Sequence, residues 1–235
     1  MELVDNTLYD DAALKSYYRF EGNSTDTKSA HNGSDTNITY GLDYGKYTQG
    51  ALFNGSTSKV TISAHTDFNP TSTFSIGAWV KADSTGSGQH YLFSNWNYQT
   101  TYQFHGWWLA ITSTGLTRFS YAVDHTTLDD ITGTTDLRDD EWHFVVITKD
   151  GTGVDKGIVY VDGELENSIT TTGDVLYDPT MYVRMGIRYN SSADDGFYKG
   201  AIDDLFIFNN KALSATEVKN LYTEPQAGGS PMYYF

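Results

Sequence analysis

The segment GAIDDLFIFNNKALSATEVKNLY, residues 200–222, decides the fold. Residues 201–208 form an apolar stretch typical of a β-strand, and a polar turn separates it from a short helix that ends the segment. Ser214, followed three positions later by Glu217, is a capping box, a pattern that marks the start of a helix. The segment therefore predicts a buried strand followed by a capped helix.

Two adjacent carboxylates, Asp203 and Asp204, interrupt this apolar strand. An unpaired carboxylate on a largely buried strand is costly, so it should be paired, protonated or metal-bound. Period-two alternation predicts one strand face with Asp203, Leu205 and Ile207, and the other with Ile202, Asp204, Phe206 and Phe208.

The rest of the chain repeats the strand pattern, with runs rich in Val, Thr and Tyr separated by Gly, Asn and Asp turns. A short helix is also expected near residues 10–18, with Asp10 or Asp11 as its cap. The pattern predicts an all-β protein: a two-sheet antiparallel β-sandwich with one or two short helices. The expected strands are residues 51–55, 59–63, 74–82, 91–96, 106–112, 118–123, 142–150, 157–163, 182–188 and 201–208.

Composition restricts the partners. The chain has 235 residues, with 15 Lys+Arg against 30 Asp+Glu and a formal net charge of −15. This field repels a phosphate backbone, so nucleic acid is not expected, whereas calcium is favoured. Cysteine is absent, which excludes disulfides and Cys-ligated zinc. No apolar run approaches the roughly 20 residues that span a bilayer, so membrane insertion is not expected either.

Five stretches, in this order, resemble the concanavalin A-like jelly rolls of the laminin-G-like, pentraxin-related type. The resemblance implies the jelly-roll form of the sandwich and covers most of the chain, but only loosely between residues 82 and 139. The stretches are YYRFEGNSTDTKSAHNGS (17–34), GKYTQGALFNGSTSKVTI (45–62), STFSIGAWVKAD (72–83), DEWHFVVITKDGTGVDKGIVYVDGEL (140–165) and YKGAIDDLFIFNNKALSATEVKNLY (198–222).

The resemblance places one jelly-roll domain over residues 14–222, after a lead segment of residues 1–13. That lead has neither a basic stretch nor an apolar core, so it is not expected to be a signal peptide. Residues 223–235, TEPQAGGSPMYYF, form a Gly/Pro-rich tail with an aromatic end. We expect this tail to dock on the domain itself, on a neighbouring copy or on another subunit.

Jelly rolls of this type commonly hold a structural calcium ion where the first and last strands meet. The resemblance implies that Asp203 supplies a carboxylate, with Glu21 and a backbone carbonyl near Gly45 as companions. Hard oxygen ligands suit calcium. The alternative is that Asp203 caps nearby backbone amides or pairs with Lys199 or Arg19.

Catalysis is not expected. The related glucanases carry a Glu-x-Asp-x-x-Glu motif on one strand, and no glutamate of this chain begins it. Glu164 and Glu166 share a strand face, but a solvated pair at an exposed edge is the simpler interpretation. The six histidines are scattered, without a spacing typical of metal sites, and no Gly-x-Ser-x-Gly elbow occurs.

Aromatic side chains interleaved with amides suit sugar rings, which offer apolar faces and hydroxyls. Such stretches occur at residues 90–112 and 188–200. Core packing is the alternative for any of these rings, and it is expected for Trp79 and Trp142. Asp194 with Asp195 could instead form a second calcium site. The predicted ligand contacts are Trp96, Tyr98, Tyr102, Trp108, Tyr189, Asn190 and Tyr198.

The sequence thus predicts a calcium-stabilised, non-catalytic jelly-roll module that binds a glycan or another surface polymer. We expect it on a cell or virion exterior, in an adhesion role. Two alternatives remain open at this level. One is a structural subunit of an extracellular filament or virion without a glycan ligand, and the other is a glycoside hydrolase.

Overall fold

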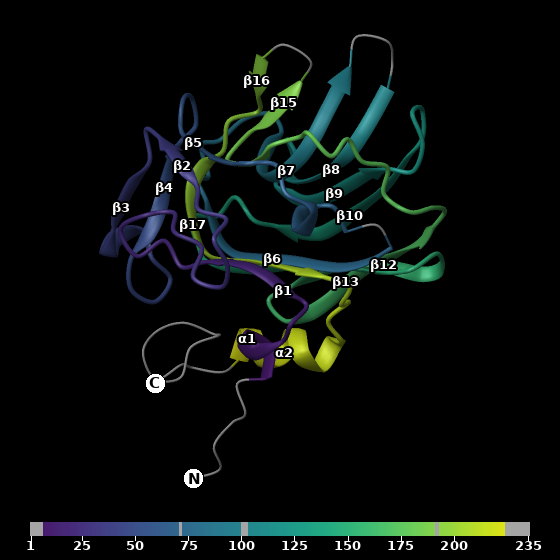
Figure 1. The fold of residues 1–235 in the computed structure, drawn as a ribbon. Helices are drawn as coiled ribbons and strands as arrows, with labels where there is room; N and C mark the ends of the chain where they lie inside the picture. Colours follow the sequence, from purple (N-terminus) through teal and green to yellow (C-terminus); the bar gives the residue numbers. More distant parts are fainter. Residues whose placement is uncertain (1–6, 71, 100–102, 191–192, 224–235) are drawn as a thin grey trace.

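The closing strand predicted from the sequence lies at the centre of a large antiparallel sheet (Figure 1). This strand, β17 (Lys199–Asn209), pairs with β6 (Thr73–Ala82) on one side and with β4 (Gly50–Asn54) and β1 (Leu14–Tyr18) on the other. The computed structural model describes residues 7–70, 72–99, 103–190 and 193–223.

Within these residues two large sheets stack into a sandwich. The eight-stranded sheet has the order β13-β12-β11-β6-β17-β4-β3, with β1 also paired to β17, and the seven-stranded sheet has the order β10-β9-β8-β7-β14-β5-β2. The remaining elements are β2 Ser34–Thr36, β3 Thr39–Gly41, η1 Leu42–Tyr44, β5 Lys59–Ile62, η2 Thr66–Phe68, β7 His90–Gln99, β8 Gln103–Ile111, β9 Leu116–Ala122, β10 Leu128–Asp136, β11 His143–Asp150, β12 Gly153–Val161, β13 Glu164–Thr171, β14 Val183–Met185, β15 Arg188–Asn190, β16 Ala193–Asp195, α1 Thr7–Asp10 and α2 Ala215–Thr223.

The main core fills the space between the two sheets. Its aromatic members include Phe53 of β4, Phe93 of β7 and Trp107 of β8, each with less than 1% of its surface exposed. Burial of apolar surface on this scale is the main favourable contribution to folding. The structure confirms the predicted all-β sandwich of antiparallel sheets.

β17 departs from simple alternation at its two aspartates. Its register against β6 shifts between Asp203 and Phe206, and Asp204 has a φ of 48°, in the left-handed region. This bulge places Ile202 in the same inter-sheet core as Leu205, whereas Phe206 lies in the cluster on the outer face. The face predicted for Ile202 is therefore wrong, because alternation fails wherever a bulge inserts an extra residue.

The N-terminal helix is shorter and earlier than predicted. α1 covers only Thr7–Asp10, and residues 14–18 form the strand β1 instead of a helix. Tyr18 of β1 pairs with Leu205 of β17, and Leu14 and Tyr17 are buried. The helix expected over residues 10–18 is wrong because pairing with β17 and burial decide the conformation of this segment.

The C-terminal helix follows the prediction. The Ser214 hydroxyl accepts a hydrogen bond from the Glu217 backbone N–H at 3.2 Å, and the Ser214 backbone N–H donates to the Glu217 carboxylate at 2.7 Å. α2 then packs Val218 and Leu221 against Trp79, on the outer face of the eight-stranded sheet. Figure 1 shows both helices on that side of the sandwich.

Trp79 and Trp142, the two tryptophans expected to pack inside, differ in depth. Trp79 is buried in the cluster under α2, whereas Trp142 is partly buried at the edge of the same cluster. Neither described helix is long and apolar enough to cross a bilayer.

Candidate functional site

Two regions of the sandwich carry the residues predicted to be functional: the junction of the first and last strands, and the outer face of the seven-stranded sheet. At the junction, the Asp203 carboxylate is almost fully buried. One oxygen accepts a hydrogen bond from the Lys46 backbone N–H at 2.9 Å, and the other from the Asp204 backbone N–H at 2.8 Å.

Two other carboxylates act electrostatically on Asp203. Burial raises the pKa of Asp203 well above its ordinary value, and the negative charges of Asp204 and then Glu21 raise it further. Asp204 accepts a hydrogen bond from the Tyr17 hydroxyl at 2.5 Å. A cation placed among these carboxylates would stabilise their ionised forms.

The loop from residue 45 to residue 49 closes the junction. The Glu21 carboxylate accepts hydrogen bonds from the Thr48 hydroxyl and from the Gln49 backbone N–H, the latter at 3.3 Å. Gly45 has no room for a side chain, because a Cβ there would lie 2.2 Å from the Thr48 carbonyl oxygen. The fold thus brings Glu21, Gly45 and Asp203 into one region, where the oxygens of both carboxylates accept hydrogen bonds.

The basic partners considered for Asp203 lie elsewhere. Lys199 pairs with Asp83 at 3.0 Å, and Arg19 contacts Glu21 at 3.7 Å. The ammonium of Lys46 lies over the Trp79 ring, 4.2 Å from its centre. Asp203 does cap two backbone amides, as the alternative predicted, and it takes part in none of the described ion pairs.

The outer face of the seven-stranded sheet carries a second candidate region. Pairing registers align one residue from each of six strands across this sheet. The row is Thr61 of β5, Arg184 of β14, Ser94 of β7, Trp108 of β8, Ser120 of β9 and Asp130 of β10.

The predicted tryptophans lie on this face but are covered. Trp108 is 3% exposed, meets the Tyr91 ring edge-on at 5.4 Å between centres, and has the Arg118 guanidinium 5.2 Å from its ring centre. Trp96 is 2% exposed and packs against Phe104. Direct ligand contact predicted for these two rings is not supported, because neighbouring side chains already cover them.

The other residues predicted to contact a ligand lie in different environments. Tyr198 is fully buried in the main core, and its hydroxyl donates to the Ala201 carbonyl at 3.1 Å, so its prediction as a ligand contact is wrong. Tyr102 lies outside the described residues, and Tyr98 is described only by its backbone in β7. Tyr189 and Asn190 are half-exposed on β15.

A half-exposed cationic site adjoins Tyr189. The Arg184 guanidinium lies 4.8 Å from the centre of the Tyr189 ring and 5.8 Å from that of Tyr182, whose side chain is 48% exposed. Burial lowers the pKa of Arg184, and the charge of Asp194 opposes this shift. The group of Tyr182, Arg184 and Tyr189, hereafter the rim triad, combines stacking surfaces with a hydrogen-bond donor.

The aspartates considered for a second calcium site have basic partners. Asp194 pairs with Lys59 of β5, and Asp195 pairs with Arg188 of β15 at 2.8 Å. These ion pairs already compensate the carboxylate charges, so the pair Asp194–Asp195 offers no concentrated negative charge for a second cation.

The acidic residues considered for catalysis are separately engaged. Glu164 pairs with Lys219 of α2, whereas Glu166 accepts a 2.8 Å hydrogen bond from the Thr134 backbone N–H. In the cross-strand row the carboxylate is Asp130, which forms an ion pair with Arg118.

Sequence reasoning missed two groups of residues. Tyr182 and Arg184 belong to a segment predicted as a strand, and alternation around buried Val183 would have placed both outward. The second group joins His31, His65 and Asp67, whose ligand atoms lie within 4.8 Å of one another. The approach of His31 has no local signal, because His31 and Asp67 are 36 positions apart in the chain.

Comparison with known proteins gives one family and many similar structures. The sequence model of a family described as the concanavalin A-like lectin/glucanases superfamily matches residues 54–219. No curated protein matches the chain significantly.

The similar solved structures include carbohydrate-related modules. Domain 4 of AbnA, a GH43 extracellular arabinanase from Geobacillus stearothermophilus, solved with arabinotriose, is 20% identical with a TM-score of 0.67, and the match covers 89% of this chain and 98% of that one. The binding domain of Paraclostridial Mosquitocidal Protein 1 is 16% identical with a TM-score of 0.71, covering 92% of this chain and 52% of that one.

A third similar structure belongs to botulinum neurotoxin type C, whose cell entry is described as dependent on interaction with two ganglioside molecules. It is 15% identical with a TM-score of 0.67, and the match covers 92% of this chain and 51% of that one. The chain therefore spans about half the length of these last two chains. At such low identity, the similarity establishes the fold.

Proposed function

This chain belongs to the concanavalin A-like lectin/glucanases superfamily, and from this premise we propose that it is a non-catalytic carbohydrate-binding module, stabilised by calcium, that acts on an extracellular surface. The observation that carries the proposal is the rim triad, in which the Arg184 guanidinium of β14 lies over the rings of both Tyr189 and Tyr182.

The chemistry of the rim triad fits a sugar. Tyr182 and Tyr189 offer aromatic surface to the apolar face of a pyranose or furanose ring, and Tyr stacking combines a large contact area with a small loss of side-chain entropy. Arg184 donates one hydrogen bond to the Tyr182 carbonyl at 3.3 Å and has further N–H groups. These donors suit a sugar hydroxyl or the carboxylate of an acidic sugar.

The similar structures support a sugar as the ligand. The arabinanase domain was solved with arabinotriose, and the neurotoxin binds gangliosides. The arabinanase is described as extracellular, which supports the proposed location.

The outer face of the seven-stranded sheet also supports a non-catalytic role. Retaining glycosidases need two carboxyl groups about 5 Å apart, and inverting ones need a wider pair that admits water. The cross-strand row contains one carboxylate, that of Asp130, and it forms an ion pair with Arg118. Within this row Asp130 has no second carboxyl group beside it, and either mechanism needs two.

Calcium would act at the strand junction as a structural ion. Asp203 and Glu21 would provide carboxylate oxygens, with the backbone near Gly45 as a further source of ligands. When bound, the ion would neutralise these carboxylates and hold the 45–49 loop against β17. This role requires no contact with the sugar.

A glycan array tests the proposal with the native chain and two variants, Tyr189→Ala and Arg184→Gln. Both should lose binding at least tenfold, because each removes either the stacking surface or the donor. Leu165→Ala is the control, since Leu165 is also a half-exposed side chain, 54% accessible, but lies on β13 of the other sheet.

Running the array in calcium and then in chelator separates the two parts of the proposal. Loss of binding only in chelator would mean that the ion supports the folded site. Absence of binding to every glycan in both conditions, by folded protein, would contradict the proposal and favour a structural subunit.

A further inference from the structure

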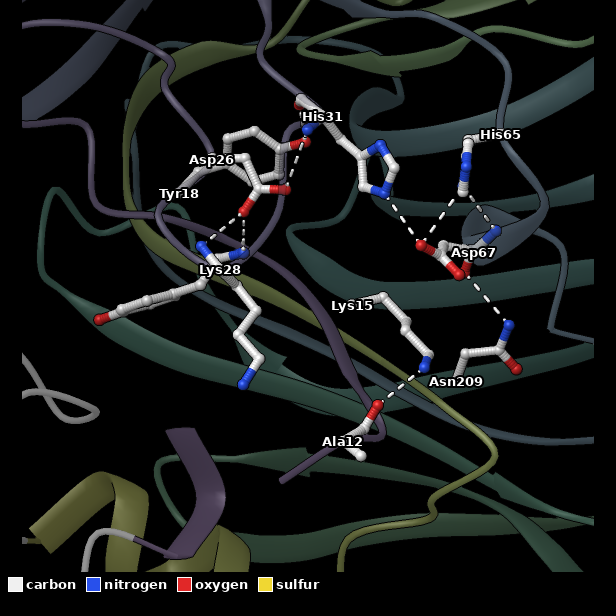
Figure 2. Close-up of polar contacts among 10 residues, drawn as sticks. Ala12, Lys15, Tyr18, Asp26, Lys28, His31, His65, Asp67 and Asn209 are labelled. Carbon is white, nitrogen blue, oxygen red and sulfur yellow. Dashed lines mark hydrogen bonds and ion pairs between the residues drawn. The ribbon is translucent and has the colours of Figure 1, made fainter. Parts of the chain in front are cut away.

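Two imidazoles and a carboxylate meet on the side of the sandwich where the loop after β1 approaches η2 (Figure 2). His31 Nε2 lies 2.9 Å from Asp67 Oδ2, and His65 Nδ1 lies 3.3 Å from the same oxygen. The two imidazole rings are adjacent, with centres 4.2 Å apart. None of these residues takes part in the proposed sugar or calcium sites.

His31 is held firmly in this position. The Tyr18 hydroxyl donates to the His31 carbonyl at 2.6 Å, and the His31 backbone N–H donates to Asp26 at 3.4 Å. The imidazole packs edge-on against Phe68, with ring centres 5.0 Å apart, and is 14% exposed. Its orientation toward Asp67 is therefore fixed by the core of the protein.

The segment that carries His65 and Asp67 is fixed in place at η2. The Asp67 backbone N–H donates to His65 Nδ1 at 3.2 Å, and Asn209 of β17 donates to the Asp67 carbonyl at 3.2 Å. His65 is 48% exposed, so the group is open to solvent on one side. A cleft of about 170 Å³ lined by His31 and His65 adjoins it.

We propose that His31, His65 and Asp67 bind one divalent transition-metal ion of the zinc class. Tetrahedral zinc with bonds of about 2.0–2.1 Å holds its ligand atoms about 3.3 Å apart. The 2.9 Å and 3.3 Å separations of His31 Nε2 and His65 Nδ1 from Asp67 Oδ2 lie close to that value. On binding the ion, His65 Nδ1 would exchange its hydrogen bond from the Asp67 backbone N–H for the metal. All three ligand atoms lie within 4.8 Å, so small side-chain rotations suffice.

The types of ligand atom indicate which metals the site suits. Two imidazole nitrogens and one carboxylate oxygen suit zinc, copper, nickel or iron and do not suit calcium, which takes oxygen ligands. Three protein ligands leave a fourth position, on the exposed side of His65, for water or a ligand.

Asp26 has a carboxylate near His31 that already accepts hydrogen bonds. Asp26 accepts hydrogen bonds from the backbone N–H groups of Tyr17 and Lys28, both at 3.0 Å, and from that of His31. Asp26 therefore fixes the loop that carries His31 and supports the site indirectly. A bound ion would join this loop to η2 and so link the segment after β1 with the segment before β6.

Calorimetric titration of untagged protein with Zn²⁺, in the presence of calcium, tests the inference. We expect one zinc per chain, and His31→Gln, His65→Gln and Asp67→Asn should each weaken binding at least tenfold. His65→Gln is the decisive variant, because its half-exposed side chain is removed without disturbing the core. The matched control is His125→Gln, in the loop between β9 and β10, which should leave the affinity unchanged.

A second readout reports the ligands directly. In two-dimensional NMR of the imidazole nitrogens, zinc should shift the signals of His31 and His65 and leave those of His125 in place. Glu21→Gln should retain zinc binding, which separates this site from the proposed calcium site. Absence of saturable zinc binding, or equal affinity in the His65→Gln protein, would overturn the inference and leave a His–Asp hydrogen-bond cluster.

Discussion

The Lys46 backbone N–H donates a 2.9 Å hydrogen bond to Asp203 Oδ2, across 157 positions of sequence. This contact joins the loop before β4 to the middle of β17. The bulge at Asp203 and Asp204 turns the first of these carboxylates toward that loop. The two aspartates that interrupt an apolar strand therefore serve to connect distant parts of the sandwich.

Calcium should stabilise the native chain through this junction. A ligand that binds only the folded state at a hundredfold excess over its Kd adds about 2.7 kcal/mol. For a domain of this size, that corresponds to a rise in Tm of about 5–10 °C. Thermal unfolding with and without calcium measures the shift.

Asp203→Asn should remove the calcium-dependent rise. It should also lower the calcium-free Tm, because the amide NH2 replaces one of the two oxygens that accept backbone N–H bonds. Glu164→Gln changes the net charge equally at a side chain that is 74% exposed and should keep the full response. An undiminished calcium shift in the Asp203→Asn protein would contradict the proposed ion site.

The sequence was sufficient wherever the signal was local. The capping box at Ser214 and Glu217 predicted the start of α2, and the apolar run predicted β17. The segment at residues 14–18 was misassigned as helix because its pairing with β17 involves residues about 190 positions away. Local propensity cannot register such a partner.

The candidate sites also differ in whether their signal in the sequence is local or depends on distant segments. Glu21, Gly45 and Asp203 were predicted together only through a family resemblance, and the structure brings them into one region. Tyr198 was misassigned because an aromatic residue in a polar stretch can still point inward. The approach of His31 to His65 depends on how a loop meets η2, and neither segment encodes that contact alone.

Stability should depend on the protonation of His143 above the ordinary histidine pKa of about 6.5. His143 Nδ1 lies 2.8 Å from Asp162, and this hydrogen bond, followed by the influence of Asp139, raises the pKa of His143. The folded state thus holds the proton more tightly than the unfolded state, whose pKa is about 6.5. The stabilisation is complete below that pH and is lost as pH rises through the higher folded-state pKa.

Denaturant unfolding between pH 6 and pH 9 measures this contribution. The difference in unfolding free energy between the native chain and His143→Gln should shrink as pH rises. Asp162→Asn should reduce that pH dependence, whereas His125→Gln should leave it unchanged. A native-minus-variant difference that is constant across the range would show that His143 does not gain a proton on folding.

The N-cap of α2 provides a test of how this helix stabilises the cluster around Trp79. Ser214→Ala removes the hydroxyl that accepts the Glu217 N–H, and a lost N-cap costs about 1 kcal/mol. We expect Tm to fall by about 2–4 °C, because α2 packs over Trp79. Thr216→Ala, an exposed hydroxyl in the same helix, should have a smaller effect. Equal losses in the two variants would show that the cap contributes nothing specific.

Tyr189 and Tyr198, nine positions apart, should respond in opposite ways to substitution. Tyr198→Phe removes the hydrogen bond to the Ala201 carbonyl inside the core, which should lower the unfolding free energy by about 1 kcal/mol and leave sugar affinity unchanged. Tyr189→Ala removes a half-exposed ring beside Arg184, which should weaken sugar binding and change stability little. Denaturant unfolding and binding to the best array ligand measure both quantities on the same samples. If Tyr198→Phe weakened binding with stability intact, Tyr198 would have to reach the ligand, and its position in the core would be incompatible with the binding state.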